Sequence, residues 1–207
     1  MKTVLFIQSG AVFGEHRLTR EELQHTVSEI DVYDLKDIDL SPYKSVAIDS
    51  FVDQRYLMEH RNIIEQFLNQ RKIVIFSGNL YLSWLPGVSN FVARKVQTHR
   101  DYEVENKLQH PIFSGVEPDH MTYKRGVSGF FARGHHPVPD GAEVILTLRG
   151  DIPITYIDRV STKGTILVHA GNDLFKYNDP DCTTGRIKPQ LMEWVEREYV
   201  SLQEGHK

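Results

Sequence analysis

Short, largely apolar runs that end in glycine, serine or aspartate recur along the first half of the chain and once more near its end. They are Val4–Ile7, Ser45–Ile48, Ile73–Phe76 and Ile166–Val168. Strands of a parallel sheet are covered on both faces, so they consist of consecutive apolar residues rather than an alternation. The runs therefore predict the strands of a parallel sheet, with one further short strand at Asp31–Leu35.

Three helices are expected between and after these strands. A Thr-x-x-Glu capping box beginning at Thr19 predicts a helix that continues to about Glu29. Asp53 can cap a second helix, whose apolar positions recur on one face as far as Leu68. A last amphipathic helix is expected at Lys188–Leu202. Alternation of strands and helices favours right-handed βαβ units.

The spacing of the strand-like runs differs in the second half of the chain. Strand-like runs at Val127–Arg133, Val144–Leu148 and Ile154–Arg159 are joined by few residues, whereas a parallel crossover needs about a dozen. These runs are therefore expected to pair antiparallel. The predicted fold is of the α/β class: a flavodoxin-like, doubly wound, mostly parallel sheet with an antiparallel extension in the second half.

Composition excludes several classes of protein without naming a function. The chain has 207 residues, 40% of them hydrophobic, and a net charge of −4, so we expect one globular domain, 1–207, and no nucleic-acid partner. The apolar run near the N-terminus is too short for a signal peptide or a membrane span. The single cysteine, Cys182, allows no intrachain disulfide. A cytoplasmic protein without a membrane partner is expected, and a homodimer is left open.

The exits of the parallel strands are where a site is expected, because ligands of open α/β sheets bind beyond the carboxyl ends of the strands. Four exit loops here carry small and polar residues that suit close backbone approach and hydrogen bonding. The candidate ligand-binding residues are Ser9, Gly10, Asp49, Ser50, Ser77, Gly78, Asn79, His169 and Asn172. Turns are rich in the same residue types, so turn chemistry explains each loop alone. Their recurrence at four exits favours a pocket for a small polar molecule.

A metal site is the alternative to a pocket for a small polar molecule. His135 and His136, together with His169 and Asp173, supply imidazole and carboxylate groups that suit zinc or iron. Adjacent histidines in a strand point to opposite faces, however, and the spacing of these residues matches no common metal motif. No metal and no cofactor is therefore predicted.

Arginines and aromatic residues in the same region allow two explanations each. The arginines are Arg125, Arg133, Arg149 and Arg159. Alternation along a strand would place some of them on one face, where they could bind an anion; a solvated sheet face is the alternative. Tyr81 and the pair Phe130–Phe131 add aromatic side chains near the expected site, although packing in a core or a subunit interface explains them more simply.

The order of elements resembles a known family. A strand ends in the turn Phe76–Tyr81, a Pro-Ile-Phe-x-Gly-Val segment follows at Pro111–Val116, and a last strand after the antiparallel region exits in His169. This arrangement is similar to the class I glutamine amidotransferase-like superfamily, and most of all to non-amidotransferase branches such as the trehalose-utilisation ThuA-like proteins. In the family's enzymes, a cysteine on the turn after a central strand is the nucleophile and a His-x-Glu pair activates it.

The chain departs from that catalytic pattern at two of the three positions. The nucleophile position falls at Asn79 or Leu80, and the residue two after His169 is Gly171 rather than glutamate. Glutamine hydrolysis by the family mechanism is therefore not expected. The resemblance implies a domain that binds a small polar ligand or a protein partner. The alternative is a diverged hydrolase or carbohydrate-processing enzyme of the ThuA-like type, with His169 and Asp173 as candidate catalytic residues.

Overall fold

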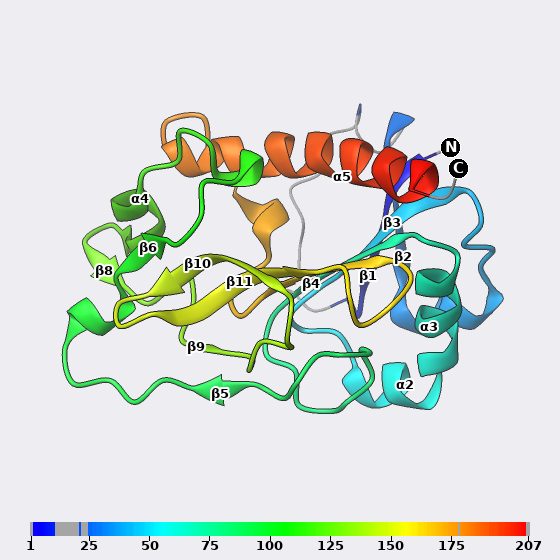
Figure 1. Ribbon diagram of the computed structural model, residues 1–207, viewed down its shortest axis with the longest axis horizontal. Coiled ribbons are helices and arrows are strands. Elements are labelled where there is room, and N and C mark those ends of the chain that lie inside the picture. The colour runs from blue at the N-terminus through cyan, green and yellow to red at the C-terminus, as the bar shows by residue number, and fades with distance from the viewer. Residues whose placement is uncertain (1, 11–20, 22–24, 178, 206–207) are drawn as a thin grey trace.

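An eight-stranded sheet forms the centre of the molecule (Figure 1). The computed structural model describes residues 2–10, 21, 25–177 and 179–205. The strand order is β2-β1-β3-β4-β12-β11-β10-β6. Strands β2 to β12 in this order pair parallel, and β11, β10 and β6 extend the sheet antiparallel. The predicted flavodoxin-like, mostly parallel sheet with an antiparallel extension is confirmed.

The bounds of the elements are as follows. The central strands are β1 (Lys2–Gln8), β2 (Val27–Asp31), β3 (Tyr43–Ile48), β4 (Ile73–Ser77), β6 (Val104–Asn106), β10 (Glu143–Leu148), β11 (Ile152–Asp158) and β12 (Thr165–His169). Two short pairs lie outside this sheet, β5 (Val92–Ala93) with β9 (Gly134–His135) and β7 (Tyr123–Lys124) with β8 (Val127–Ser128). The α-helices are α2 (Gln54–Glu59), α3 (Arg61–Asn69), α4 (Pro118–Thr122) and α5 (Ile187–Glu204). The 3-10 helices are η2 (Val32–Asp37), η3 (His99–Tyr102), η4 (Pro111–Phe113), η5 (Leu174–Lys176) and η6 (Thr183–Arg186).

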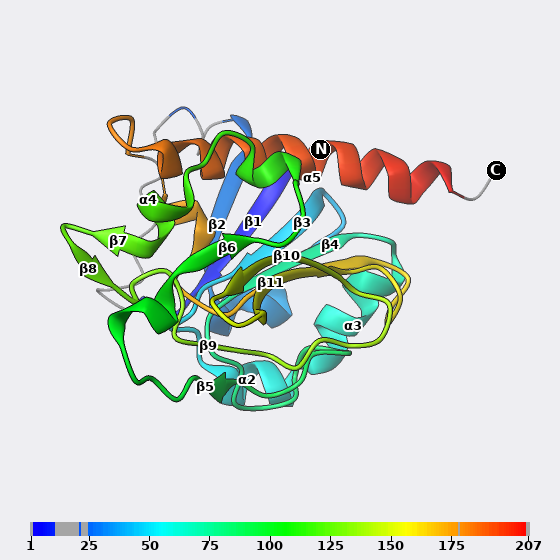
Figure 2. The ribbon, with the colours of Figure 1, turned by 60° about the vertical axis from the view of Figure 1, so that its left-hand side comes forward.

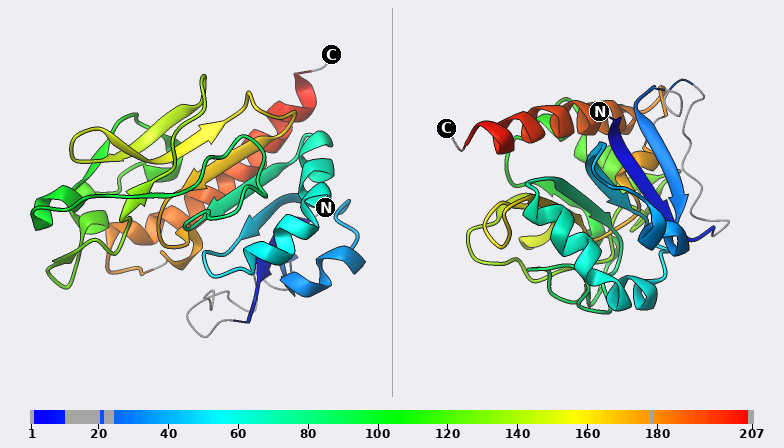
Figure 3. Two further views of the ribbon diagram at one scale, coloured as in Figure 1. Left: turned by 90° about the horizontal axis from the view of Figure 1, so that it is seen from below. Right: turned by 90° about the vertical axis from the view of Figure 1, so that its right-hand side faces the viewer.

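Helices cover both faces of the sheet. Figure 3 shows α5 along one face and α2 and α3 against the other. Leu191 and Trp194 of α5 are buried in the core on the first face, and Ile64 and Phe67 of α3 in the core on the second. No helix among the described residues is long and apolar enough to cross a membrane.

Strand β4 shows why the sequences of the inner strands are continuous apolar runs. Ile73 and Ile75 belong to the core under α5, whereas Val74 and Phe76 belong to the core under α3. Successive side chains of a strand point to opposite faces, so a strand covered on both sides needs apolar residues at every position. The strands predicted from such runs are confirmed as β1, β3, β4 and β12.

The structure corrects the prediction for the segment after β1. The capping box at Thr19 lies outside the described residues, and the helix predicted from it cannot reach Glu29 because Val27–Asp31 is β2. The predicted strand Asp31–Leu35 is wrong: the Asp31 carboxylate accepts a hydrogen bond from the backbone N–H of Tyr33 at 3.0 Å and starts η2 instead. The helix predicted after Asp53 is present but is divided into α2 and α3 at His60.

The antiparallel region is also partly corrected. Strands β10 and β11 pair antiparallel as predicted, and the helix predicted at Lys188–Leu202 is present as α5. The strand predicted at Val127–Arg133 is wrong. Only Val127–Ser128 forms a strand, in a hairpin whose turn holds Arg125 and Gly126 at positive φ. Figure 2 shows this hairpin projecting from the sheet beside α4. The third antiparallel strand is β6, and the remaining segment lies over the exit of β12, where Ala132 bridges to Gly171.

Candidate functional site

Strands β1, β3, β4 and β12 end side by side at one edge of the sheet. Ile7 pairs with Ile48, Ile48 with Phe76, and Ser77 with His169. The loops that follow these residues therefore leave the sheet at the same level. This is the edge at which open α/β sheets bind their ligands.

Two glycines allow these loops to approach one another closely. At Gly78, which has φ +140°, a Cβ would lie 2.7 Å from the Cα of Ser50. At Gly171, a Cβ would lie 1.8 Å from the carbonyl oxygen of Phe131. The exit of β4 is thus pressed against the exit of β3, and the segment before β9 is pressed against the exit of β12. Any side chain at either position would force the loops apart.

A cavity of about 350 Å³ opens between these loops. It is lined by Ser50, Phe51, Gly78, Asn79, Tyr81, Gly129, Phe130, Phe131, Ala132, Arg133, Ala170, Gly171 and Asn172. Four of the predicted candidates, Ser50, Gly78, Asn79 and Asn172, are among these residues. The structure therefore brings the exits of β3, β4 and β12 together around one pocket.

His169 lies beneath this pocket and is fully buried. Its Nδ1 is 2.8 Å from Oγ1 of Thr155, and its Nε2 is 3.3 Å from the carbonyl oxygen of Phe131. Burial lowers the pKa of His169 from 6.5 to about 4, against the opposing influence of the Phe131 carbonyl and of Asp173. Both ring nitrogens thus bond within the protein, and a neutral imidazole links β11, β12 and the segment that forms the wall of the pocket.

Three further candidates are buried at the exits of β3, β4 and β12 and hold the loops in place. Asp49 accepts the backbone N–H of Ser50 at 2.7 Å and lies 4.0 Å from Nζ of Lys176. Asp173 accepts the N–H of Phe175 at 3.0 Å and caps η5. The hydroxyl of Ser77 lies 3.4 Å from the N–H of Leu174. Ser77, Asp49 and Asp173 are each at most 3% exposed, so they support the pocket from below.

The remaining candidates follow β1. The hydroxyl of Ser9 donates to the carbonyl oxygen of Phe51 at 2.7 Å, so Ser9 fixes one side of the pocket without lining it. Gly10 is exposed and takes a positive φ of 64° in the turn after β1.

The side chains that the sequence did not assign to the site are aromatic and cationic. Phe51, Tyr81, Phe130 and Arg133 all line the cavity. The sequence places Tyr81 and Phe130 near the expected site and makes Arg133 a possible anion-binding residue, but it does not distinguish these roles from a buried core or a solvated strand. The nearest signal was Gly129, which at φ +83° turns the chain away from the predicted strand.

His136 belongs to the pair of adjacent histidines named as a possible metal site, but its ring bonds to the protein backbone. It is fully buried, and its Nε2 accepts a hydrogen bond from the backbone N–H of Leu80 at 3.1 Å. Burial, together with the charge of His135, lowers the pKa of His136 to about 4. The imidazole therefore fixes the turn that follows β4.

Neither position at which the family's cysteine would fall in the turn after β4 carries a nucleophile. Asn79 faces the pocket, and its side-chain nitrogen donates to the hydroxyl of Tyr81 at 3.2 Å. Leu80, the other position at which a nucleophile would fall, is fully buried. Amide, hydroxyl and guanidinium groups line this pocket, and these are groups that bind a polar ligand.

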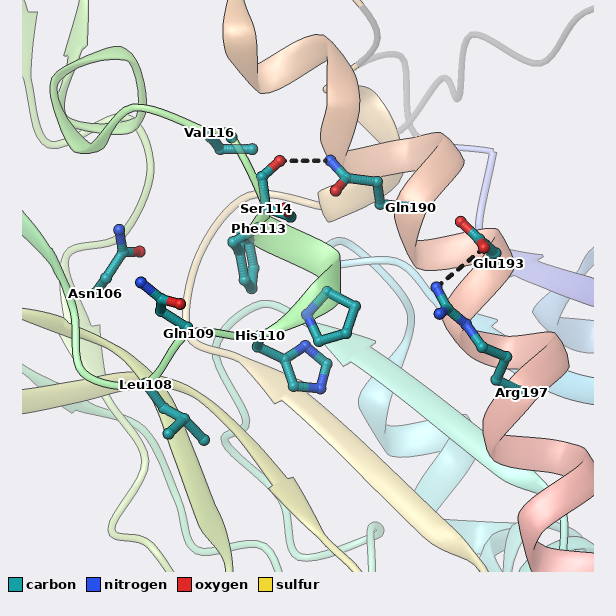
Figure 4. A pocket seen from close by; sticks show the side chains of 12 residues that line it. Asn106, Leu108, Gln109, His110, Phe113, Ser114, Val116, Gln190, Glu193 and Arg197 are labelled. Carbon is teal, nitrogen blue, oxygen red and sulfur yellow. Dashed lines mark hydrogen bonds and ion pairs between the residues drawn. The ribbon is translucent and has the colours of Figure 1, made fainter.

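A second pocket, of about 630 Å³, lies between α5 and the segment that follows β6 (Figure 4). Three of its polar side chains, all from α5, have partners among the lining residues. Arg197 pairs with Glu193 at 3.1 Å, and Gln190 donates to the carbonyl oxygen of Ser114 at 3.2 Å. None of its described lining residues comes from the strand exits, so the smaller pocket is the stronger candidate.

Comparisons with known proteins bear on the fold. No family model matches the sequence, and no curated protein matches it. Among solved structures, a cytoplasmic protein from Salmonella typhimurium LT2 is similar, with 12% identity, a TM-score of 0.53, and coverage of 98% of this chain and 96% of that one. A glutamine amidotransferase from Thermotoga maritima is also similar, with 15% identity, a TM-score of 0.50, and coverage of 98% and 93%. The chain therefore has a fold like that of glutamine amidotransferases.

Proposed function

We propose that this chain is a glutamine amidotransferase-like domain without the Cys-His-Glu triad, and that it binds a small polar ligand in the pocket at the exits of β3, β4 and β12. The observation that carries the proposal is the close approach of the exit loops at Gly78 and Gly171, which encloses a cavity of about 350 Å³. Pockets for small molecules fall in the range of about 300–1,000 Å³.

The chemistry of the pocket supports binding rather than hydrolysis of glutamine. Asn79 and Leu80, the two positions at which the family's nucleophile would fall, carry no nucleophilic group, and His169 is buried with both ring nitrogens bonded. The diverged hydrolase of the ThuA-like type, in which His169 and Asp173 would be catalytic, is less well supported. Both side chains are buried, and each bonds within the protein.

A ligand screen against a blocked pocket tests this proposal. Thermal unfolding of the wild-type chain would be followed with a panel of amino acids, sugars, nucleotides and organic acids. We expect at least one compound to raise Tm by a few degrees, because a ligand that binds only the folded state stabilises it. Asn79→Trp, which places an indole in the cavity, should abolish that shift.

The matched control is Asn90→Trp, because Asn90 is exposed and does not line the cavity. It should leave the ligand-induced shift unchanged. The proposal fails if no compound stabilises the wild-type chain, or if Asn79→Trp responds to the ligand as the wild type does.

A further inference from the structure

Exposed aromatic side chains gather around this one pocket. Phe51, Tyr81 and Phe130 are 51%, 62% and 43% exposed, and they come from three different loops. Among the described residues, Phe51 and Phe130 are the only two phenylalanines that are largely exposed. The ring of Phe51 also faces Nζ of Lys176, which lies 5.7 Å from the ring centroid. A largely exposed phenyl ring gains little for the fold, whereas at the wall of a cavity it offers a flat apolar face to a ligand.

The backbone beside each of these rings is held by a side chain from another element. Ser9 donates to the carbonyl oxygen of Phe51, and Asn172 donates to the carbonyl oxygen of Phe130. The backbone N–H of Tyr81 donates to the side-chain oxygen of Gln54 at 2.8 Å. The three rings are therefore carried on fixed loops, which lowers the entropic cost of ordering them around a ligand.

Arg133 is the only charged residue among the described residues that line the cavity. Its Nε donates to the carbonyl oxygen of Gly129 at 2.7 Å, and its two terminal nitrogens form no hydrogen bond or ion pair with the described residues. Two other arginines of the region each have a carboxylate partner: Arg149 lies 3.6 Å from Glu103, and Arg159 bonds to Glu198 at 2.7 Å. The terminal guanidinium nitrogens of Arg133 are thus free to hold a carboxylate or a phosphate.

We propose that the ligand of this pocket is a small molecule that joins a planar aromatic ring to an anionic group. The ring would pack against Phe51, Tyr81 and Phe130, and the anion would pair with Arg133. This inference rests on the proposed function and narrows its ligand to one chemical class. A nucleoside monophosphate and an aromatic carboxylic acid share this chemistry, and both are of a size that the cavity admits.

Paired probes separate the contributions of ring and charge. Calorimetric titration would compare adenosine 5′-monophosphate with adenosine and with ribose 5-phosphate, and phenylacetate with 2-phenylethanol and with cyclohexylacetate. We expect one aromatic anion to bind at least tenfold more tightly than both its neutral and its ring-free counterparts. The pair that responds distinguishes a phosphate from a carboxylate ligand.

Variants assign the effect to the residues. Arg133→Gln should weaken binding of that probe at least tenfold, Arg133→Lys should weaken it less, and Phe130→Leu should weaken it severalfold. Arg149→Gln is the matched control and should bind as the wild type does. Thermal unfolding of each variant without ligand confirms that it is folded.

The outcomes separate this inference from the proposed function. Some compounds will bind the wild-type chain but not Asn79→Trp. If each of these compounds lacks either the aromatic ring or the anionic group, the pocket binds ligands but the inference about their class is wrong. The same holds if Arg133→Gln folds and binds the aromatic anion undiminished. If no compound of any class binds in a manner that Asn79→Trp abolishes, both the inference and the proposed function fail.

Discussion

Gly78 stands where β4 leaves the sheet, and its backbone passes against Ser50. Because a Cβ there would lie 2.7 Å from the Ser50 Cα, and because φ is +140°, we expect Gly78→Ala to destabilise the fold by about 1–3 kcal/mol. Urea unfolding measures the loss. Gly126→Ala is the control, since Gly126 also has a positive φ but, apart from its chain neighbours, no described residue comes within 4 Å of its Cβ position. Equal losses in both variants would show that the contact with Ser50 is not what requires glycine.

Some residues of the pocket were predictable from the sequence and others were not. Ser50, Gly78, Asn79 and Asn172 follow buried strands, and the position of a strand exit in a parallel sheet is fixed by the strand itself. The side chain of Phe130, in contrast, was indistinguishable from a core residue. Its exposure depends on where the segment folds over β12, which is a tertiary property that no local pattern encodes.

At the scale of elements, Gln54 of α2 clamps the turn that follows β4. Its side-chain nitrogen donates to the carbonyl oxygen of Asn79 at 2.7 Å, and its side-chain oxygen accepts the backbone N–H of Tyr81 at 2.8 Å. We expect Gln54→Ala to cost about 1–2 kcal/mol, since each such hydrogen bond contributes about 1 kcal/mol. Hydrogen exchange at the amides of Tyr81 and Leu82 should accelerate.

The exposed Gln66 of α3 offers a comparison on the neighbouring helix. Gln66→Ala should leave exchange at Tyr81 and Leu82 as it is in the wild type. If Gln54→Ala also leaves those amides protected, the turn is held by His136 and its own packing rather than by α2.

The inner strands of the sheet could be predicted from their sequences, whereas the edge strands could not. Strands β1, β3, β4 and β12 have neighbours on both sides and cores on both faces, so their apolar runs were unmistakable. Strands β2 and β6 are the two edges of the sheet. The three residues Val104–Asn106 include only one apolar side chain, because an edge strand with little to cover needs no apolar run. These edges are the two strands of the central sheet that the sequence pattern did not predict.

At the scale of the whole molecule, an ion-pair network joins α5 to the antiparallel half of the sheet. Arg159, after β11, donates to Glu198 of α5 at 2.7 and 2.9 Å and to Glu143 of β10 at 2.9 Å. Thr165 of β12 donates to Glu198 at 2.6 Å. Because the Glu198 side chain is only 9% exposed, Arg159→Met would leave a largely buried carboxylate without its cationic partner.

We expect Arg159→Met to lower the free energy of unfolding by about 1–3 kcal/mol. The Arg159 side chain is 39% exposed, which keeps the loss below that of a fully buried pair. Arg55→Ala removes an ion pair with Glu59 in which the arginine is 86% exposed, and it should change stability by less than about 0.5 kcal/mol. A loss for Arg159→Met as small as that for Arg55→Ala would mean that the pair between Arg159 and Glu198 adds little to the attachment of α5.

The two buried histidines link the stability of the whole fold to pH. Burial lowers the pKa of both His136 and His169 from 6.5 to about 4, so between these pH values the unfolded chain binds more protons than the folded chain. Stability is therefore fully retained above about pH 6.5 and is lost as the pH falls toward 4, by at most about 1.4 kcal/mol per pH unit for each histidine.

Urea unfolding at pH 7.5, 6.0 and 5.0 should show this decline. His136→Gln and His169→Gln should each flatten it, whereas His99→Gln, at an exposed position, should not. Carboxyl groups whose pKa is held low, such as that of Asp53, lose their contribution only at lower pH, so an unchanged slope in both buried-histidine variants would exclude these imidazoles as the source.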